Sequence, residues 1–571
     1  MRDELTELDL SLLSPLQERY AGRGRDALLP MLFDCQSLYG WLPRQVQQAV
    51  SETLRVPLAD IHGVIEFYTM LYNQPTAKKV VRICDDLACS LAGAEPVIEA
   101  IGRQLGLAPG ETSADQSVTF ELVPCLGMCD QAPCGLVGDR PGGHLVPEAV
   151  TDFLSGRHPE PQASASGELL VAASSVGGGQ TPSLGDFLAG DGFEALKKAM
   201  AMGPEKYIDF IESCGILGRG GAMFPLGRKW RFTRAADGNT RFVVVNGDES
   251  EPGTFKDRCF MEEDPYAVLE GAMLAAYAVG AQKGWIFIRG EYPRAYRRLQ
   301  KAVAEAREKG LLGSGILDSN FNFDVEIRRG AGAYVCGEET ALFEAIEGRR
   351  GFPRIRPPFP TTHGLFGKPT AINNVETLVT ARLATLIGRE AWLAHGTKNS
   401  PGTKLFCLSG DVSRPGLYEA PFGVTVREMI ERAGGVPDGR EIRAILLGGA
   451  AGLFIDRSLL DMPLTYEDAR ANDVTLGSGV IMVFDDRADL RLALKQIGHF
   501  FAHESCGKCF PCQLGTQRQL EILEGDLIGP ADKAALFDLG QAMTETSLCG
   551  LGQTASSAIL SAIRLWPELS R

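Results

Sequence analysis

Four cysteines near the carboxyl end of the sequence have the spacing of an iron–sulfur ligand set. Cys506, Cys509 and Cys512 form a C-x2-C-x2-C triplet, and Cys549 stands alone further along the chain. A tight triplet can bind three irons of a cubane, and a remote cysteine can bind the fourth. The pattern predicts one 4Fe-4S cluster and is the strongest single signal in the sequence.

Four further cysteines form two close pairs. Cys84-x4-Cys89 and Cys125-x3-Cys129 each follow a short strand-like run. Four thiolates are the ligand count of a 2Fe-2S cluster. Buried structural thiols and a zinc site are the alternatives, but zinc favours a two-residue gap, which neither pair has. We therefore predict a 2Fe-2S cluster on these four cysteines.

Other candidate ligands fit no such pattern. Cys134 follows the second pair but lies outside its spacing, so we interpret it as structural. His499 and His503 are about one helical turn apart, yet a helix face without a third ligand is more often structural. The remaining cysteines are interpreted as core or loop thiols: Cys35, Cys214, Cys259, Cys336 and Cys407.

A glycine-rich loop over residues 215–230 has the composition of a phosphate cradle. Its glycines leave the backbone N–H groups open, and Arg219, Arg228 and Lys229 supply cations. The spacing is neither the Rossmann G-x-G-x-x-G nor the P-loop motif, and a lone glycine-rich turn is more often structural. The polar segments that follow favour the phosphate interpretation.

Polar segments follow several of the predicted strands. An apolar run at 242–245 leads into the acidic segment 246–257, and a strand at 322–328 leads into the glycine-rich segment 330–339. Cations and amides follow at 349–360 and 372–377. Carboxylates at strand ends accept hydrogen bonds from ribose hydroxyls or a nicotinamide amide and disfavour a 2'-phosphate. This arrangement indicates NAD(H) rather than NADP(H).

These segments must be positioned by several domains, since a chain of 571 residues exceeds the usual size of one. Residues 1–75 are predicted to be helical. Residues 76–157 are predicted to follow the order strand, cysteine pair, helix, strand, cysteine pair. Residues 195–400 are predicted to alternate between helices and strands. Residues 158–194, with the Ser-, Ala- and Gly-rich stretch 159–182, are predicted to be a flexible linker. Short strands and one helix follow at 401–485, then helices at 486–571.

Composition limits the possible partners. The 57 basic and 72 acidic residues give a net charge of -15, which disfavours nucleic acid and anionic membranes. We expect neither a signal peptide nor a membrane-spanning helix, and hence a cytoplasmic protein. The 14 cysteines of such a protein indicate metal or redox use rather than a disulfide framework.

Two stretches resemble subunits of respiratory complex I. Residues 20–155 are similar to its thioredoxin-like 2Fe-2S subunit, and residues 195–571 to its flavoprotein subunit. The resemblance implies a multi-domain α/β protein: a helical bundle with a thioredoxin-like 2Fe-2S domain, a Rossmann-like FMN and NADH domain, a ubiquitin-like (soluble-ligand-binding) α+β domain at 401–485 and a helical 4Fe-4S domain. It also implies FMN and NAD(H) as cofactors.

The resemblance assigns site residues by position. It implies that FMN contacts Gly218, Arg219, Gly220, Lys229, Asn246, Asp248, Glu249, Tyr334, Gly337, Glu338, Asn373 and Asn374. It implies that NADH contacts Phe224, Lys229, Phe232, Glu251, Glu339, Arg356 and Phe359, with the three phenylalanines around the adenine. Two positions depart from the family: Met223 stands where glycine is usual and Arg356 where lysine is usual. No side chain is expected to act as a nucleophile or general base.

Fusion of the two halves is typical of diaphorase subunits of NAD-dependent formate dehydrogenases and NAD-reducing hydrogenases. Hydrogenase versions often lack cysteines of the first half, whereas all four are present here. The resemblance therefore favours the beta subunit of a molybdenum- or tungsten-containing formate dehydrogenase, partnered by the alpha subunit. A hydrogenase or complex I partner is the alternative, and a non-catalytic iron–sulfur electron carrier is an alternative of another class.

Overall fold

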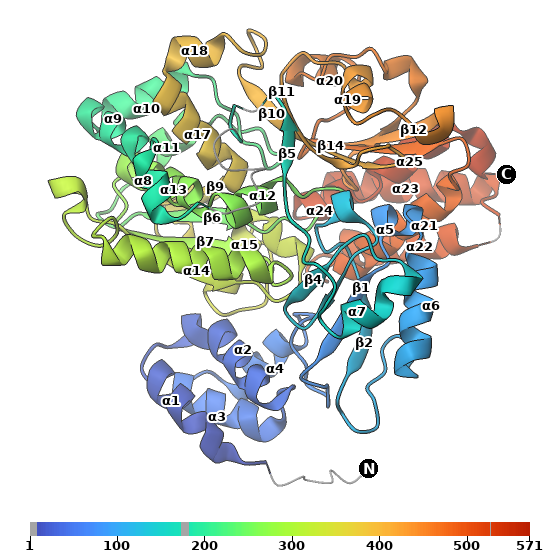
Figure 1. The fold of residues 1–571 in the computed structure, drawn as a ribbon, viewed down its shortest axis with the longest axis horizontal. Coiled ribbons are helices and arrows are strands. Elements are labelled where there is room, and N and C mark those ends of the chain that lie inside the picture. Colours follow the sequence, from blue (N-terminus) through green and yellow to red (C-terminus); the bar gives the residue numbers. More distant parts are fainter. Residues whose placement is uncertain (1–7, 169, 173–181, 526, 571) are drawn as a thin grey trace.

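The computed structural model describes residues 8–168, 170–172, 182–525 and 527–570. An N-terminal group of helices and a small sheet lie beside a larger α/β domain, and a second sheet with the C-terminal helices covers the remaining side (Figure 1). Among the described residues no helix is long and apolar enough to cross a membrane.

The N-terminal segment is helical, as predicted. Its apolar positions, such as Leu32, Val46, Val50 and Ile61, are fully buried and pack in one cluster with residues of the larger α/β domain. The helices are α1 (Ser14–Tyr20), α2 (Leu28–Tyr39), α3 (Arg44–Leu54) and α4 (Leu58–Ile65).

A four-stranded sheet of order β2-β1-β3-β4 follows. Its central strand β1 pairs parallel with β2 and antiparallel with β3, so the ends of β1 and β2, which lead into the two cysteine pairs, lie at the same edge. The elements are β1 (Val80–Cys84), α5 (Leu87–Leu91), α6 (Ala94–Leu105), β2 (Thr119–Val123), β3 (Gly135–Val137), β4 (Arg140–Gly142) and α7 (Val150–Leu154).

The described part of residues 158–194 contains regular structure and is not the flexible linker that the sequence predicts. Strand β5 (Ala165–Gly167) pairs parallel with β11 (Gly416–Pro421), and the Glu419 carboxylate accepts the N–H groups of residues 170, 171 and 172 at 2.7–3.0 Å. A buried carboxylate with three backbone donors holds this part of the segment against the sheet. Residues 169 and 173–181 lie outside the described part, and α8 (Leu184–Ala189) follows.

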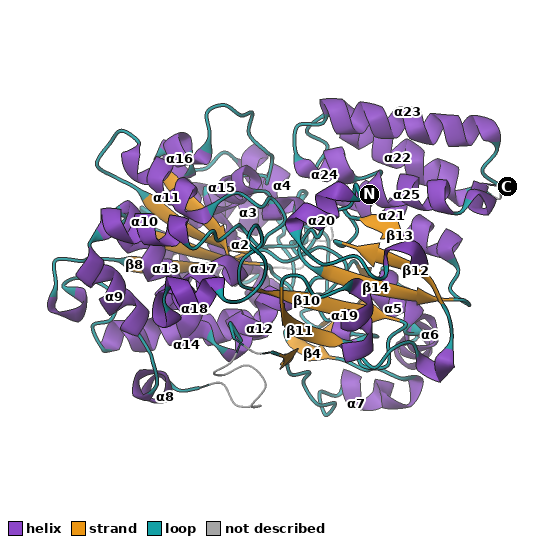
Figure 2. Ribbon diagram, turned by 90° about the horizontal axis from the view of Figure 1, so that it is seen from above, coloured by secondary structure: helices purple, strands orange, loops and turns teal. Residues whose placement is uncertain are grey.

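The larger α/β domain is built on a fully parallel sheet of order β8-β7-β6-β9 with helices on both faces (Figure 2). Its strands are β6 (Phe242–Gly247), β7 (Lys283–Ile288), β8 (Asp324–Arg329) and β9 (Thr370–Asn374). Its helices are α9 (Glu194–Met202), α10 (Pro204–Ser213), α11 (Leu226–Ala235), α12 (Lys256–Glu263), α13 (Pro265–Val279), α14 (Pro293–Glu308), α15 (Glu339–Ile346), α16 (Pro360–His363), α17 (Val375–Ile387) and α18 (Arg389–Leu393).

The next domain is a mixed sheet of order β13-β12-β14-β10-β11-β5. Its other elements are β10 (Thr403–Gly410), α19 (Val426–Arg432), β12 (Ile442–Leu447), β13 (Leu453–Ile455), α20 (Tyr466–Ala471) and β14 (Val480–Asp485). The C-terminal helices are α21 (Leu490–Glu504), α22 (Phe510–Glu524), α23 (Pro530–Thr546), α24 (Gly550–Thr554) and α25 (Ser557–Leu565).

Candidate functional site

The parallel sheet brings the predicted polar segments together. Val245 of β6 pairs in register with Asn373 of β9, and Gly247 with Ile288 of β7, so the loops that leave these strands share one edge. Ligands of open α/β sheets bind outside the carboxyl ends of the strands. Strand β8 pairs parallel with β7, so the segments that begin at 246, 330 and 373 all lie at this edge of the sheet.

The glycine-rich loop closes on itself beside this edge. The Gly218 N–H donates to Phe224 O at 3.0 Å, and the Leu226 N–H donates to Ile216 O at 2.9 Å. A Cβ on Gly220 would lie 3.3 Å from Cβ of Asn374, so the loop backbone lies close to the end of β9. Lys229, on α11, donates from Nζ to Ile372 O at 2.8 Å, and burial lowers the pKa of its ammonium group.

The two adjacent asparagines at the end of β9 have different environments. Asn373 is buried, and its Nδ2 has no hydrogen-bond partner among the described residues. Asn374 is occupied: Nδ2 donates to Asp257 Oδ2 at 2.6 Å, and Oδ1 accepts the Thr377 N–H at the start of α17. A buried amide without a partner is costly unless a ligand completes it, so Asn373 fits a polar group bound at this edge.

The acidic segment after β6 and the second glycine-rich segment are joined directly. Asn246 Nδ2 donates to Gly337 O at 2.8 Å, and Asn246 Oδ1 accepts the Asp248 N–H at 3.1 Å. Burial raises the pKa of Asp248 to about 7. Glu338 accepts the Thr340 and Ala341 N–H groups at 3.0 and 2.9 Å and so caps α15.

The three phenylalanines predicted for the nucleotide lie on the outer side of the site. Phe224, Phe232 and Phe359 are 41%, 45% and 57% exposed, unusual for large apolar rings, and the first two rings have centroids 6.5 Å apart. Arg356 Nη1 donates to Glu339 Oε1 at 2.6 Å. Exposed aromatic faces beside a charged pair can stack on a base while the polar groups bind a ribose or an amide.

The C-terminal cysteines surround one small hollow. Cys506, Cys509, Cys512 and Cys549 all line it, together with Pro353 from the α/β domain. Burial raises the pKa of Cys512 to about 12 and that of Cys549 to about 11, so these thiols ionise at neutral pH only with a metal bound. Four converging thiols fit a 4Fe-4S cluster.

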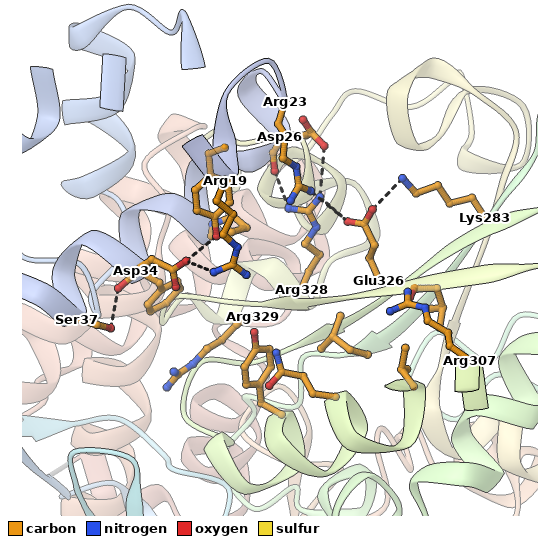
Figure 3. Close-up of a pocket in the computed structure, with 18 residues that line it drawn as sticks. Arg19, Arg23, Asp26, Asp34, Ser37, Lys283, Arg307, Glu326, Arg328 and Arg329 are labelled. Atoms are coloured by element: carbon orange, nitrogen blue, oxygen red, sulfur yellow. Dashed lines mark hydrogen bonds and ion pairs between the residues drawn. The ribbon is translucent and has the colours of Figure 1, made fainter. Parts of the chain in front are cut away.

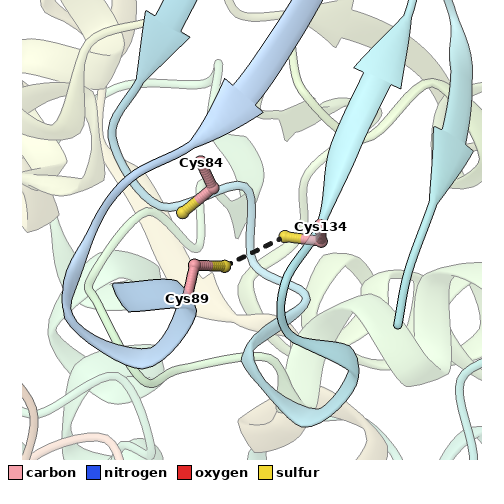
Figure 4. Close-up of side chains that lie close together, drawn as sticks. All are labelled: Cys84, Cys89 and Cys134. Carbon is pink, nitrogen blue, oxygen red and sulfur yellow. Dashed lines mark hydrogen bonds between the residues drawn. The ribbon is translucent and has the colours of Figure 1, made fainter. Parts of the chain in front are cut away.

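The N-terminal cysteines form two groups of thiols. Cys125 and Cys129 have their Sγ atoms 3.3 Å apart. The Sγ atoms of Cys84, Cys89 and Cys134 all lie within 4.8 Å of one another (Figure 4). Two groups of thiols fit the two irons of a 2Fe-2S cluster. Cys134, interpreted from the sequence as structural, belongs to the second group.

Known proteins match this organisation along the whole chain. Residues 14–157 match the family described as thioredoxin-like [2Fe-2S] ferredoxin, 211–382 the Nuo51 FMN-binding domain, 405–450 the SLBB domain, and 492–570 the NADH-ubiquinone oxidoreductase-F iron-sulfur binding region. The NAD-reducing hydrogenase HoxS subunit alpha of Cupriavidus necator is 34% identical over 98% of this chain and 94% of its own length. The chain belongs to this family of diaphorase subunits.

Two further similarities support this assignment. One of the NADH-quinone oxidoreductase subunits of Rhizobium meliloti is 43% identical over 67% of this chain and 92% of its own length. A crystal structure of NAD+-reducing [NiFe]-hydrogenase in the air-oxidized state superimposes with a TM-score of 0.83 at 31% identity, covering 96% of this chain and 93% of that one. The diaphorase subunit has FMN, NAD(H), one 2Fe-2S and one 4Fe-4S cluster as cofactors, and the described thiols and the free Asn373 amide fit them.

The side chain of Arg219 in the diaphorase subunit is bound within the protein. Its guanidinium, 1% exposed, donates to Thr403 O and Tyr466 Oη at 3.1 Å each and lies 4.7 Å from the Phe422 ring centroid. The cation therefore holds the glycine loop against the neighbouring domain that contains β10 and α20. The sequence could not show this, because the acceptors lie about 180 residues or more along the chain.

Glu249 is also occupied within the protein. Its carboxylate accepts the Asp257 and Arg258 N–H groups at 2.9 Å each, at the start of α12, and its Oε2 accepts the Tyr292 hydroxyl at 3.2 Å. Burial, and then the nearby Asp257 carboxylate, raises its pKa to about 7. Both oxygens of this predicted flavin ligand are therefore used to hold the acidic segment in place.

Met223 lies in the glycine loop with a left-handed backbone, at φ 53°. This conformation is costly for a residue with a Cβ and is readily adopted by glycine. The sulfur-containing side chain packs on the cluster of buried residues in the SLBB domain. Methionine at a position where glycine is usual therefore strains the backbone locally, beside the predicted nucleotide site.

Three residues that the sequence analysis missed connect the site to the two clusters. Arg289, one residue beyond β7, donates from Nη1 to Glu249 O at 2.7 Å and from Nη2 to Cys125 O at 2.6 Å. Glu504 lies at the end of α21, two residues before Cys506, and accepts the Tyr334 N–H at 2.8 Å. Arg258 pairs with Asp130 at 3.1 Å beside Cys129. The sequence signal that could have identified Arg289 is its position directly after a strand of the parallel sheet.

A larger hollow, of 780 Å³, lies between α1, α2, α14 and β8, away from these residues (Figure 3). Its cations are paired: Arg19 with Asp34 at 2.9 Å, Arg328 with Glu326 at 3.0 Å and Lys283 with Glu326 at 3.0 Å. None of the predicted cofactor residues lines it in the described part of the chain.

Proposed function

We propose that this diaphorase subunit exchanges electrons between NAD(H) and a separate catalytic subunit, with FMN at the edge of the parallel sheet and the 4Fe-4S cluster beside it. One short segment carries the proposal. Pro353 lines the hollow of the four C-terminal cysteines, and Arg356, three residues further on, pairs with Glu339 of the predicted nucleotide site. Residues 353–356 therefore lie beside both the cage of the four C-terminal cysteines and the predicted nucleotide site.

When bound, the flavin supplies hydride exchange with NAD(H) and single-electron exchange with iron–sulfur centres. The side chains of this protein bind and orient. The free Nδ2 of Asn373 and the nearby Lys229 are placed to bind an anionic or carbonyl oxygen at the end of β9. Phe224, Phe232 and Phe359 are placed to cover the adenine, and Glu339 to bind the ribose or nicotinamide of NAD(H).

Two candidate catalytic partners have separate support. The complete set Cys84, Cys89, Cys125 and Cys129 favours a molybdenum- or tungsten-containing formate dehydrogenase alpha subunit. The similarity over 98% of this chain to the alpha subunit of an NAD-reducing hydrogenase favours a hydrogenase partner. Either partner would receive or supply electrons through the clusters, and neither requires a catalytic side chain here.

The first test is electron paramagnetic resonance of the anaerobically purified protein before and after addition of NADH. We expect NADH to produce a 4Fe-4S signal and, if its potential is high enough, a 2Fe-2S signal. Signals that appear with dithionite but not with NADH would contradict the proposal and favour an electron carrier without nucleotide turnover. Two measurements on the purified complex distinguish the two partners. One compares NAD+ reduction driven by formate with NAD+ reduction driven by hydrogen, and the other is the content of molybdenum, tungsten and nickel.

A further inference from the structure

The cage of the 2Fe-2S cluster contains a fifth thiol. Cys84 ends β1, Cys89 lies in α5, and Cys134 directly precedes β3. All three are buried, and their Sγ atoms lie within 4.8 Å of one another, with Cys89 and Cys134 3.6 Å apart (Figure 4). Two thiolates on one tetrahedral metal ion lie about 3.8 Å apart when each bond is about 2.3 Å. The spacing is therefore that of ligands to one iron.

The other side of the cage has only two thiols. Cys125 and Cys129 lie 3.3 Å apart on the loop after β2, and among the described residues no further cysteine, histidine or carboxylate joins them in a group of three. Each iron of a 2Fe-2S cluster with four cysteine ligands takes two thiolates. One iron thus has its full complement, and the other has one thiol in excess.

Backbone pairing fixes the position of Cys134. Ile83 of β1 is in register with Gly135 of β3, and the Cys84 N–H donates to Cys134 O at 3.1 Å. A Cβ on Gly135 would come within 2.4 Å of Ile83 Cδ1 and 2.8 Å of Arg82 O, so glycine at this position allows β3 to lie against β1. The thiol of Cys134 is held in the cage by the sheet itself.

We propose that Cys134 is a spare ligand of the 2Fe-2S cluster, meaning a thiol that can replace either Cys84 or Cys89 on the same iron. The substitution exchanges one thiolate for another, so the charge and oxidation state of the cluster do not change. The proposal makes the two sides of the cage unequal: loss of a ligand is tolerated on the side of Cys84 and Cys89 and is not tolerated on the side of Cys125 and Cys129.

The test compares alanine variants of the full chain, reconstituted anaerobically and reduced with dithionite. We expect Cys84→Ala and Cys89→Ala to keep a 2Fe-2S signal with shifted g values, and the matched controls Cys125→Ala and Cys129→Ala to lose it. The double variant Cys89→Ala/Cys134→Ala is expected to lose the signal, and Cys134→Ala alone to keep it. The 4Fe-4S signal and bound flavin of each sample report whether the rest of the chain is folded.

A second comparison identifies the replacing atom. If Cys134 takes the vacant position, Cys89→Ser and Cys89→Ala have the same spectrum, because both clusters keep four thiolates. An oxygen ligand in Cys89→Ser would instead give a spectrum of its own and overturn the proposal. Loss of the signal in both Cys84→Ala and Cys89→Ala, as complete as in Cys125→Ala, would also overturn it, as would loss in Cys134→Ala alone. If one of the single variants does not fold, the other tests the same exchange.

Discussion

Arg289 donates a hydrogen bond from Nη2 to the backbone carbonyl of Cys125 at 2.6 Å. Its other terminal nitrogen, Nη1, donates to Glu249 O at 2.7 Å, and the Glu291 carboxylate pairs with Nη2 at 3.0 Å. One guanidinium, 4% exposed, thus connects a ligand loop of the 2Fe-2S cage with the acidic segment of the proposed flavin site. Residues 164 positions apart are joined by a charge that lies next to a redox centre.

Replacement of this arginine tests the connection. We expect Arg289→Met to lower the 2Fe-2S reduction potential by about 60 mV, a tenfold change for one electron, because a nearby positive charge favours the reduced cluster. Stability should fall by about 3–5 kcal/mol, since Glu291 and two carbonyl groups lose a buried partner. A redox titration followed by paramagnetic resonance measures the first effect, and urea unfolding the second.

The control for this substitution is Arg427→Met. Arg427 is 45% exposed and pairs with Asp461 at the surface of the SLBB domain. Surface ion pairs contribute about 0–1 kcal/mol. Equal potentials of the 2Fe-2S cluster in Arg289→Met and Arg427→Met would show that the guanidinium does not act on the cluster.

The glycine loop gives a second prediction. Because Met223 has a left-handed φ of 53°, Met223→Gly removes strain of about 1–2 kcal/mol but adds unfolded-chain entropy of about 0.5–1 kcal/mol, so stability should change little. If the side chain narrows the nucleotide site, the variant lowers KM for NADH and leaves kcat unchanged. Steady-state kinetics with an artificial acceptor measure both constants. Met223→Leu keeps the side-chain volume and should keep the KM of the parent; an unchanged KM in Met223→Gly would refute the steric role.

Sequence and structure agree where function depends on local spacing. The sequence predicts the cysteine triplet, the two cysteine pairs and the order of helices and strands, because ligand spacing and apolar periodicity are properties of short segments. It does not predict the position of Cys134 beside Cys84 and Cys89, since the neighbours of Cys134 come from the pairing of β3 with β1. The partners of the Arg219 guanidinium could not be predicted for a similar reason, because its acceptors, Thr403 and Tyr466, belong to another domain.

The pH dependence of stability gives a third prediction. Burial raises the pKa of Glu251 from 4.5 to about 7, against a hydrogen bond from the Ala451 N–H at 2.7 Å. Between these two pH values the folded protein keeps a proton that the unfolded chain has lost, so stability falls as pH rises from about 4.5 to about 7 and levels off above. At 1.36 kcal/mol per unit, the contribution of this group is at most about 3 kcal/mol.

Glu251→Gln removes this titration and preserves the oxygen that accepts the Ala451 N–H. The variant should therefore lose less stability than the parent between about pH 5 and about pH 7.5, as measured by urea unfolding of the flavin-free protein. Glu441→Gln is the matched control, because Glu441 is exposed and its pKa is lowered by Arg457. The prediction fails if the parent and Glu251→Gln lose stability equally over this interval.

The two asparagines at the end of β9 give the sharpest test of the flavin site. The Asn373 Nδ2 has no partner in the described part of the protein, so Asn373→Ala should weaken FMN binding roughly tenfold and leave the unfolding midpoint of the flavin-free protein nearly unchanged. Asn374 caps α17 and donates to Asp257, so Asn374→Ala should lower the stability of the flavin-free protein by about 1 kcal/mol or more. Quenching of flavin fluorescence measures affinity, and urea unfolding measures stability. If instead Asn373→Ala destabilised the flavin-free protein as much as Asn374→Ala, the free amide would have a structural partner and would not be reserved for a ligand.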